Sequence, residues 1–144
     1  MIADMEAGVG TLTRMQAGSV DLALLVTEPS PRSIEVSRRA REIISERKIG
    51  PVLVVANKVR HAADLGRVAA ELSGCEVVAV PQDPEVDRAD REGLAVIDVA
   101  PASPAVLAVR ELTRIVTTWQ TSTASTGTSA IAMAPTTSRQ PPGS

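Results

Sequence analysis

The sequence has almost no aromatic residues. Trp119 is the one aromatic side chain among 144 residues, and there is no Phe or Tyr. The core must therefore be built from Val, Ile, Leu and Ala, which suits strands that are buried on both faces beneath helices. The sequence also has a single cysteine. One thiol excludes an internal disulfide framework and fits a reducing cytosol.

The two signs of charge are nearly balanced. The 15 basic and 17 acidic side chains give a net charge of −2, so the composition does not suggest nucleic-acid binding. The basic cluster of Arg38, Arg39 and Arg41 alternates with glutamates, which is typical of a solvated helix face. No signal-peptide pattern opens the chain, and no apolar run approaches the length of a membrane span. We therefore expect a cytoplasmic protein that has neither a nucleic-acid nor a membrane partner.

Short apolar segments alternate with helical ones along the first 117 residues. After an opening stub, Met1–Asp4, three Val-rich runs without alternation are typical of buried parallel strands: Leu22–Val26, Val52–Val55 and Val77–Val80. Helical spacing of apolar residues is found between and after these runs, over 31–49, 62–74 and 103–116, with Ser30 as a cap and Gly50 as a stop signal. This order predicts an α/β fold with an incomplete open parallel sheet that is flanked by helices.

The composition changes near Thr118. The remaining residues are rich in Ser, Thr, Ala, Pro and Gly, carry almost no charge and have no periodic apolar face. Such a segment has too little apolar surface to bury. We expect a folded domain over residues 1–117 and a disordered, dispensable tail over residues 118–144.

Ligands of open parallel sheets bind beyond the carboxyl ends of the strands, so the loop "ANKV" is a candidate site. The Asn57 amide offers a donor and an acceptor to a purine edge, and the Lys58 stem can lie along the ring. GTPases have an acidic guanine reader two positions after this lysine. Arg60 stands there and cannot accept a hydrogen bond, so adenine is favoured if a purine binds. A helix-capping loop is the alternative.

Two further loops follow strand ends. In "VPQDP", the residues Pro81, Gln82 and Asp83 form either the wall of a base pocket or an ordinary turn. In "DMEAGVG", Asp4 has the chemistry to hold Mg²⁺ through water, and Gly8 would let a backbone N–H approach a phosphate.

The order and spacing of "DMEAG", "EPS", "NKVR" and "VPQDP" produce a family resemblance. Residues 1–117 resemble the C-terminal half of MinD/ParA-type (deviant Walker A, SIMIBI) P-loop ATPases, above all the CooC-type branch that matures nickel carbon monoxide dehydrogenase. The resemblance implies a partial P-loop NTPase fold, with ATP and Mg²⁺ as cofactors. It also implies a metalloenzyme client, and either a homodimer or a heteromer with a chain that carries the phosphate loop.

The resemblance also implies roles for individual residues. Asp4 would lie near Mg²⁺ and the attacking water, and Gly8 would face the γ-phosphate. Asn57 would contact adenine, and the loop Pro81–Asp83 would form the wall of the base pocket with Lys58 beside it.

The sequence departs from this family in one main respect. It contains no G-x-x-x-x-G-K-[ST] phosphate loop, which in the family precedes the position of Asp4. The paired nickel-binding cysteines of the CooC branch are also absent, and we expect Cys75 to be a small core residue. We therefore expect that Met1 is an internal start and that the chain is inactive alone as an ATPase. A non-catalytic interaction module and one half of a split ATPase are the alternatives.

The missing strand raises a question about the sheet. In the family, the strand that leads into the phosphate loop lies between the strand that ends at Asp4 and Leu22–Val26. Its loss would leave a gap of about 9.6 Å, or two strand spacings. Either Met1–Asp4 pairs directly with Leu22–Val26, or another chain inserts a strand. We expect direct pairing and a four-stranded parallel sheet, with Asp4 displaced from the position of a magnesium ligand.

Overall fold

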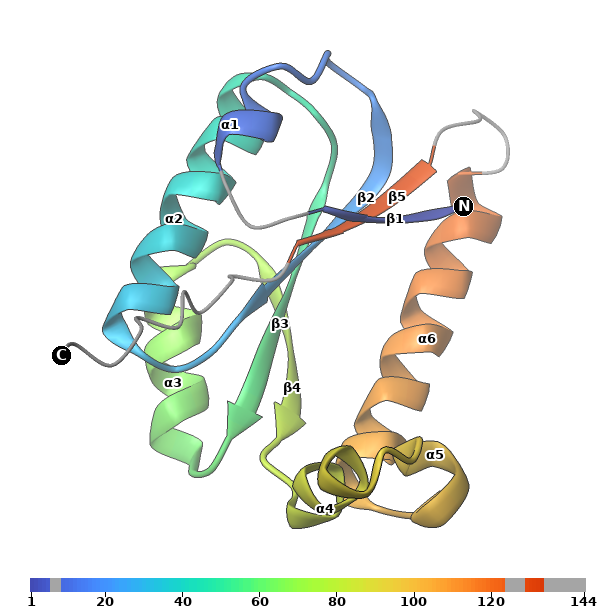
Figure 1. The fold of residues 1–144 in the computed structure, drawn as a ribbon. Coiled ribbons are helices and arrows are strands. Elements are labelled where there is room, and N and C mark those ends of the chain that lie inside the picture. Colours follow the sequence, from blue (N-terminus) through green and yellow to red (C-terminus); the bar gives the residue numbers. More distant parts are fainter. Residues whose placement is uncertain (6–8, 124–128, 134–144) are drawn as a thin grey trace, which may run out of the picture.

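The computed structural model describes residues 1–5, 9–123 and 129–133. Five strands form one sheet in the order β1-β5-β2-β3-β4, and every neighbouring pair is parallel (Figure 1). The strands are β1 (Ile2–Met5), β2 (Val20–Thr27), β3 (Val52–Val59), β4 (Glu76–Pro81) and β5 (Ser129–Met133). The helices are α1 (Val9–Leu12), α2 (Pro31–Glu46), α3 (Ala62–Glu71), α4 (Pro84–Glu92), α5 (Val96–Val99) and α6 (Pro104–Thr123). The predicted α/β class with an open parallel sheet is confirmed.

Helices cover both faces of the sheet. Helices α1, α2 and α3 lie on one face, and α4, α5 and α6 lie on the other (Figure 1). Neighbouring residues of β3 point to opposite faces: Val54 joins the core cluster under α2 and α3, whereas Leu53 joins the cluster under α6. Both side chains are at most 1% exposed. Full burial of one such side chain contributes about 1.5–3 kcal/mol, so this aliphatic core explains how the chain folds with one aromatic residue.

Helix α2 begins as its sequence predicts but ends earlier. The Ser30 side chain accepts a hydrogen bond from the Ser33 N–H at 3.2 Å, and Pro31 occupies the first turn. The helix ends at Glu46, before the predicted stop at Gly50. Gly50 has another role, because a Cβ atom there would lie 2.5 Å from the backbone oxygen of Val20. Glycine therefore allows the chain that enters β3 to approach the start of β2.

Strand β5 occupies the gap that we expected between β1 and β2. Ile131 is in register with Ala3 of β1 on one side and with Ala23 of β2 on the other. The expectation of direct pairing in a four-stranded sheet is therefore wrong, and the inserted strand comes from the same chain. Pairing both edges with β5 satisfies backbone groups that would each cost about 1–3 kcal/mol if they were buried without partners.

The chain beyond Thr118 contributes to the fold. Helix α6 continues to Thr123, and Trp119 packs against the cluster that contains Leu22 and Leu53. The expectation of a disordered tail from residue 118 is therefore wrong for 118–123 and for β5. Residues 124–128 and 134–144 lie outside the described residues. No helix in the described ranges is both long enough and apolar enough to span a membrane.

Because β1 pairs with β5, we expect the backbone hydrogen bonds of β1 to depend on an intact β5. Proline removes the N–H that an interior strand donates, so Ala132→Pro should disrupt β5 and release β1. We expect the amides of Ile2–Met5 to lose their protection in hydrogen exchange, while those of β3 and β4 keep theirs. Ala132→Ser retains the N–H and is the matched control. Full protection of β1 in the proline variant would contradict the strand order.

Candidate functional site

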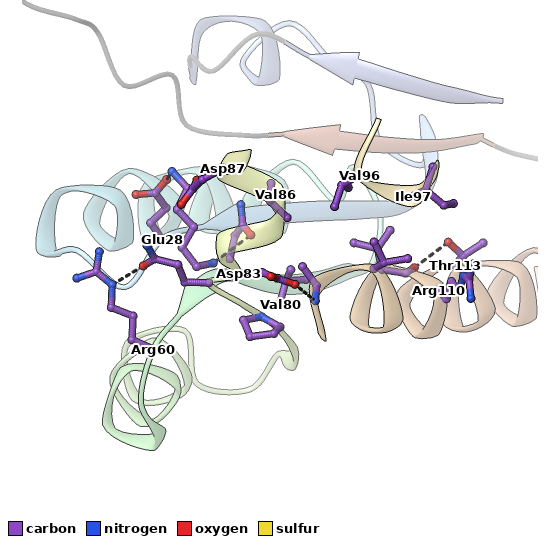
Figure 2. Close-up of a pocket in the computed structure, with 17 residues that line it drawn as sticks. Glu28, Arg60, Val80, Asp83, Val86, Asp87, Val96, Ile97, Arg110 and Thr113 are labelled. Atoms are coloured by element: carbon purple, nitrogen blue, oxygen red, sulfur yellow. Dashed lines mark hydrogen bonds and ion pairs between the residues drawn. The ribbon is translucent and has the colours of Figure 1, made fainter. Parts of the chain in front are cut away.

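A cavity of about 560 Å³ opens at the carboxyl ends of β3 and β4 (Figure 2). Its floor is Val80 and Pro81 at the end of β4, and its sides come from α4, α5 and α6. Figure 2 shows Glu28 and Arg60 at one end of the cavity and Arg110 and Thr113 at the other. The cavity therefore has a polar end at the strand termini and an apolar part along α6, which ends at the polar side chains of Arg110 and Thr113.

The end of β3 is irregular, and this irregularity positions two predicted site residues. The register between β3 and β4 shifts between Ala56 and Val59, and Lys58 has a left-handed backbone with φ of 57°. The half-buried Asn57 accepts the Lys58 backbone N–H at its own Oδ1, at 3.0 Å. The Lys58 Nζ lies 2.7 Å from Glu28 Oε1, beyond the end of β2. Both side chains are therefore oriented by specific contacts and both line the cavity.

A second pair of contacts joins the loops after β3 and β4. The backbone N–H of Gln82 donates to the carbonyl oxygen of Val59 at 2.9 Å. The Arg60 Nε–H donates to Gln82 Oε1. Arg60 and Gln82 both line the cavity. The polar end of the cavity is therefore built from the loops after β3 and β4, which are joined by one backbone and one side-chain hydrogen bond.

Asp83 connects two walls of the cavity. One carboxylate oxygen accepts the Glu85 N–H at 3.0 Å and caps α4, while the other accepts the Ala105 N–H at 3.0 Å at the start of α6. The hydrogen bond from Ala105, followed by that from Glu85, lowers the pKa of Asp83 below its ordinary value. The side chain is 5% exposed. Asp83 lines the cavity, and both of its carboxylate oxygens accept backbone N–H groups.

The apolar part of the cavity was not predicted from the sequence. Helices α4 and α5 face this part of the cavity with Val86, Val96 and Ile97. One face of α6 lines the cavity with four residues at helical spacing: Val106, Val109, Arg110 and Thr113. The spacing i, i+3, i+4, i+7 on α6 is the signal that could have identified this face. Within the described residues, neither Asp87 nor Arg110, which also line the cavity, forms a side-chain hydrogen bond or ion pair.

The predicted site residues thus fall into two groups. Asn57, Lys58, Pro81, Gln82 and Asp83 all line this one cavity. Asp4 does not; it is exposed on β1, which lies three strand spacings from β3, about 14 Å away. Gly8 lies outside the described residues. Cys75 is half-buried against the core cluster under α2 and α3. The described part of the chain holds no group of three or more His, Cys, Asp or Glu side chains that could bind a metal ion.

The chain is similar to three curated proteins, and no protein-family model matches it. It is 28% identical over 103 residues to the carbon monoxide dehydrogenase accessory protein CooC of Rhodospirillum rubrum, covering 71% of this chain and 39% of that protein. It is 34% identical over 93 residues to an uncharacterized ATP-binding protein of Methanocaldococcus jannaschii, covering 62% of this chain and 36% of that protein. A second uncharacterized ATP-binding protein of that organism is 28% identical over 98 residues, covering 65% and 39% of the two chains.

These similarities support a relationship to CooC-like P-loop ATPases. The chain spans little more than a third of the length of each of these relatives. The similarity therefore bears on one part of their structure.

The contacts of Asp83 predict a pH-dependent loss of stability. Because folding lowers its pKa below the ordinary value of 3.8, Asp83 stabilises the fold above that pH, and this contribution disappears as the pH falls through the folded-state pKa. Asp83→Asn should lower the melting temperature at pH 7, and the difference from the wild type should shrink in acid. Asp87→Asn, which changes an exposed carboxylate of the same helix, should alter neither. A difference that persists unchanged at pH 2 would contradict this role.

The left-handed backbone at Lys58 predicts an order of stability between two variants. Lys58→Gly and Lys58→Ala both remove the ion pair with Glu28, but only glycine adopts this backbone without a Cβ clash. We expect the glycine variant to be more stable than the alanine variant by about 1 kcal/mol in urea unfolding. The reverse order would show that the β3 irregularity is absent in solution.

Proposed function

We propose that this chain is the base-binding part of a MinD/ParA-type P-loop ATPase related to CooC, and that its cavity takes the adenine of ATP. The observation that carries this proposal is the gathering of Asn57, Lys58, Pro81 and Gln82 around one cavity at the carboxyl ends of β3 and β4. Such strand ends are where open α/β sheets bind their ligands. The similarity to CooC and to two ATP-binding proteins favours a nucleotide as the ligand.

The walls of the cavity suit a purine. Val80, Val106, Val96 and Ile97 line the cavity and offer apolar surface to a planar ring. Polar groups at the strand ends would read the edge of the base, with the Asn57 amide foremost. Arg60 lines the same end and has no acceptor, so this part of the cavity favours adenine over guanine.

The phosphates require groups that this sequence does not provide. Phosphoryl transfer depends on positioning and on stabilising negative charge, and the 144 residues contain no glycine-rich phosphate loop with its lysine. We therefore propose that these 144 residues do not hydrolyse ATP by themselves and that a segment outside them provides the phosphate loop. Mg²⁺ would neutralise phosphate charge in the combined site. Asp4 fits this ion as one carboxylate ligand, since Mg²⁺ takes its other ligands from phosphates and water.

The similarity to CooC also supports a proposal for the client protein and for the cellular location of this chain. The name of the Rhodospirillum rubrum relative connects that protein to carbon monoxide dehydrogenase. We extend this to a role beside a metalloenzyme client, in a homodimer or a heteromer, in the reducing cytoplasm that suits the free thiol of Cys75.

A non-catalytic interaction module is the second candidate function. It is favoured by four large apolar side chains near α5 and α6 that remain about half exposed: Leu94, Ile97, Leu107 and Val109. Binding of a partner protein without nucleotide would support this candidate.

The proposal predicts weak nucleotide binding that depends on the base. Because the phosphate-binding loop is lacking, adenosine and ATP should bind with Kd values within about tenfold of each other, or ~1.4 kcal/mol, as measured by calorimetry. Guanosine should bind more weakly than adenosine, and Asn57→Ala should remove this preference. Gln16→Ala, which removes an exposed amide remote from the cavity, is the control. A micromolar Kd for ATP, about −8 kcal/mol, with much weaker binding of adenosine would contradict the proposal.

A further inference from the structure

The Gln82 side chain is held by Arg60, and we infer that this contact selects which groups on the edge of the base the cavity accepts. The inference rests on the proposed function, because it concerns the same cavity. In it, Arg60 is a positioning residue and Gln82 is the residue that reads the ligand. The selection depends on whether the oxygen or the NH₂ group of the Gln82 and Asn57 side-chain amides already has a hydrogen-bond partner within the protein.

Arg60 is fixed at both ends. Its backbone N–H donates to Asp64 Oδ2 at 3.1 Å, and its Nε–H donates to Gln82 Oε1. The carboxylate of Asp64 also accepts the His61 N–H at 3.2 Å, so it is itself held at the start of α3. The guanidinium is thus attached to a structured turn, and it reaches across to the loop after β4.

A guanidinium has donors and no acceptor, so it decides the orientation of the amide that it contacts. Gln82 must turn its oxygen toward Arg60, which leaves the two N–H groups of Nε2 for the cavity that the residue lines. The Gln82 backbone is fixed as well, through the hydrogen bond from its N–H to Val59. In the described part of the chain, Gln82 Nε2 has no hydrogen-bond partner, so its donors are available to a ligand.

Asn57 has the same arrangement. Its Oδ1 accepts the Lys58 backbone N–H, and its Nδ2 has no hydrogen-bond partner in the described part of the chain, so the Nδ2 donors are available to a ligand. The carboxylate of Glu28, which also lines this end, is paired with Lys58. The Gln82 and Asn57 amides therefore present donors, and the atoms of the ligand that meet these two amides must be acceptors. The ring nitrogens of a purine are such acceptors, and the Gln82 amide would donate to one of them. The carboxylates of Glu28 and Asp87 line the same end and are acceptors for donor groups of the ligand, such as the exocyclic amine of adenine.

The experiment follows the side-chain NH₂ signals of Gln82 and Asn57 by ¹⁵N NMR during titration with adenosine. This method measures weak binding on the chain as it exists. Both NH₂ signals should shift as adenosine binds, while that of the exposed Gln16 should not. Arg60→Met should lower adenosine affinity about threefold to tenfold, the range expected for one hydrogen bond. It should also move the ligand-free Gln82 NH₂ signal toward that of Gln16.

Two further variants separate positioning from general damage to the site. Arg60→Lys keeps a donor for Gln82 Oε1 and should restore part of the lost affinity. Gln82→Glu keeps an acceptor for Arg60 but removes the NH₂ donors, and should lower affinity while the Asn57 signal still shifts. Deaza-adenosines replace one ring nitrogen each by C–H. One of the 1-, 3- and 7-deaza compounds should bind the wild type more weakly than adenosine, and should show no such loss with Gln82→Glu.

The outcomes distinguish the inference from the proposed function. If no signal around the cavity moves with adenosine or ATP, both are overturned. If adenosine binds but Arg60→Met changes neither its affinity nor the Gln82 signal, the inference alone is overturned. Full loss of affinity in Arg60→Lys would also overturn it, because a donor to Gln82 would remain.

Discussion

The cavity depends on the carboxylate of Asp83. One oxygen caps α4 and the other caps α6, so a single side chain joins two walls at the end of β4. A buried carboxylate is tolerated only when its oxygens are hydrogen-bonded, and the two backbone donors come from Glu85 and Ala105, on different helices. The geometry of the cavity is thereby coupled to hydrogen bonds between its own walls. Asp83, which the family resemblance places in the wall of a base pocket, thus joins two walls of the cavity.

The sequence predicted the parts of the site whose signals are local. Asn57 and Lys58 directly follow a Val-rich strand, and "PQDP" directly follows another, so their placement at one edge of the sheet follows from parallel strand order alone. The double capping by Asp83 could not be predicted, because Ala105 is 22 residues away. The apolar wall of α5 was missed for a similar reason: a four-residue helix has too few positions to show periodicity, and its place opposite α6 is set by tertiary contacts.

Strand β5 shows the same limit at the level of the fold. Its five residues are apolar or small and stand in a stretch rich in Ser, Thr and Ala, so the local pattern predicts no strand. These residues form a strand because β1 and β2 each present an unpaired edge, and β5 pairs with both edges in parallel register. A consequence concerns Asp4. With one strand between them, β1 and β2 lie about 9.6 Å apart, which is the spacing implied by the family resemblance, although a different segment supplies the strand.

The division between a base site and a missing phosphate site has a thermodynamic consequence for the proposed function. If a second polypeptide provides the phosphate loop, one ATP molecule contacts both chains, and the adenine cavity holds only part of it. Linkage then requires that ATP tighten the association of the two chains by the same factor by which association tightens ATP binding. This factor equals the gain in ATP affinity that the phosphate contacts add to the base site. The contacts of Gln82 and Asn57 would then determine which nucleotide joins the two chains.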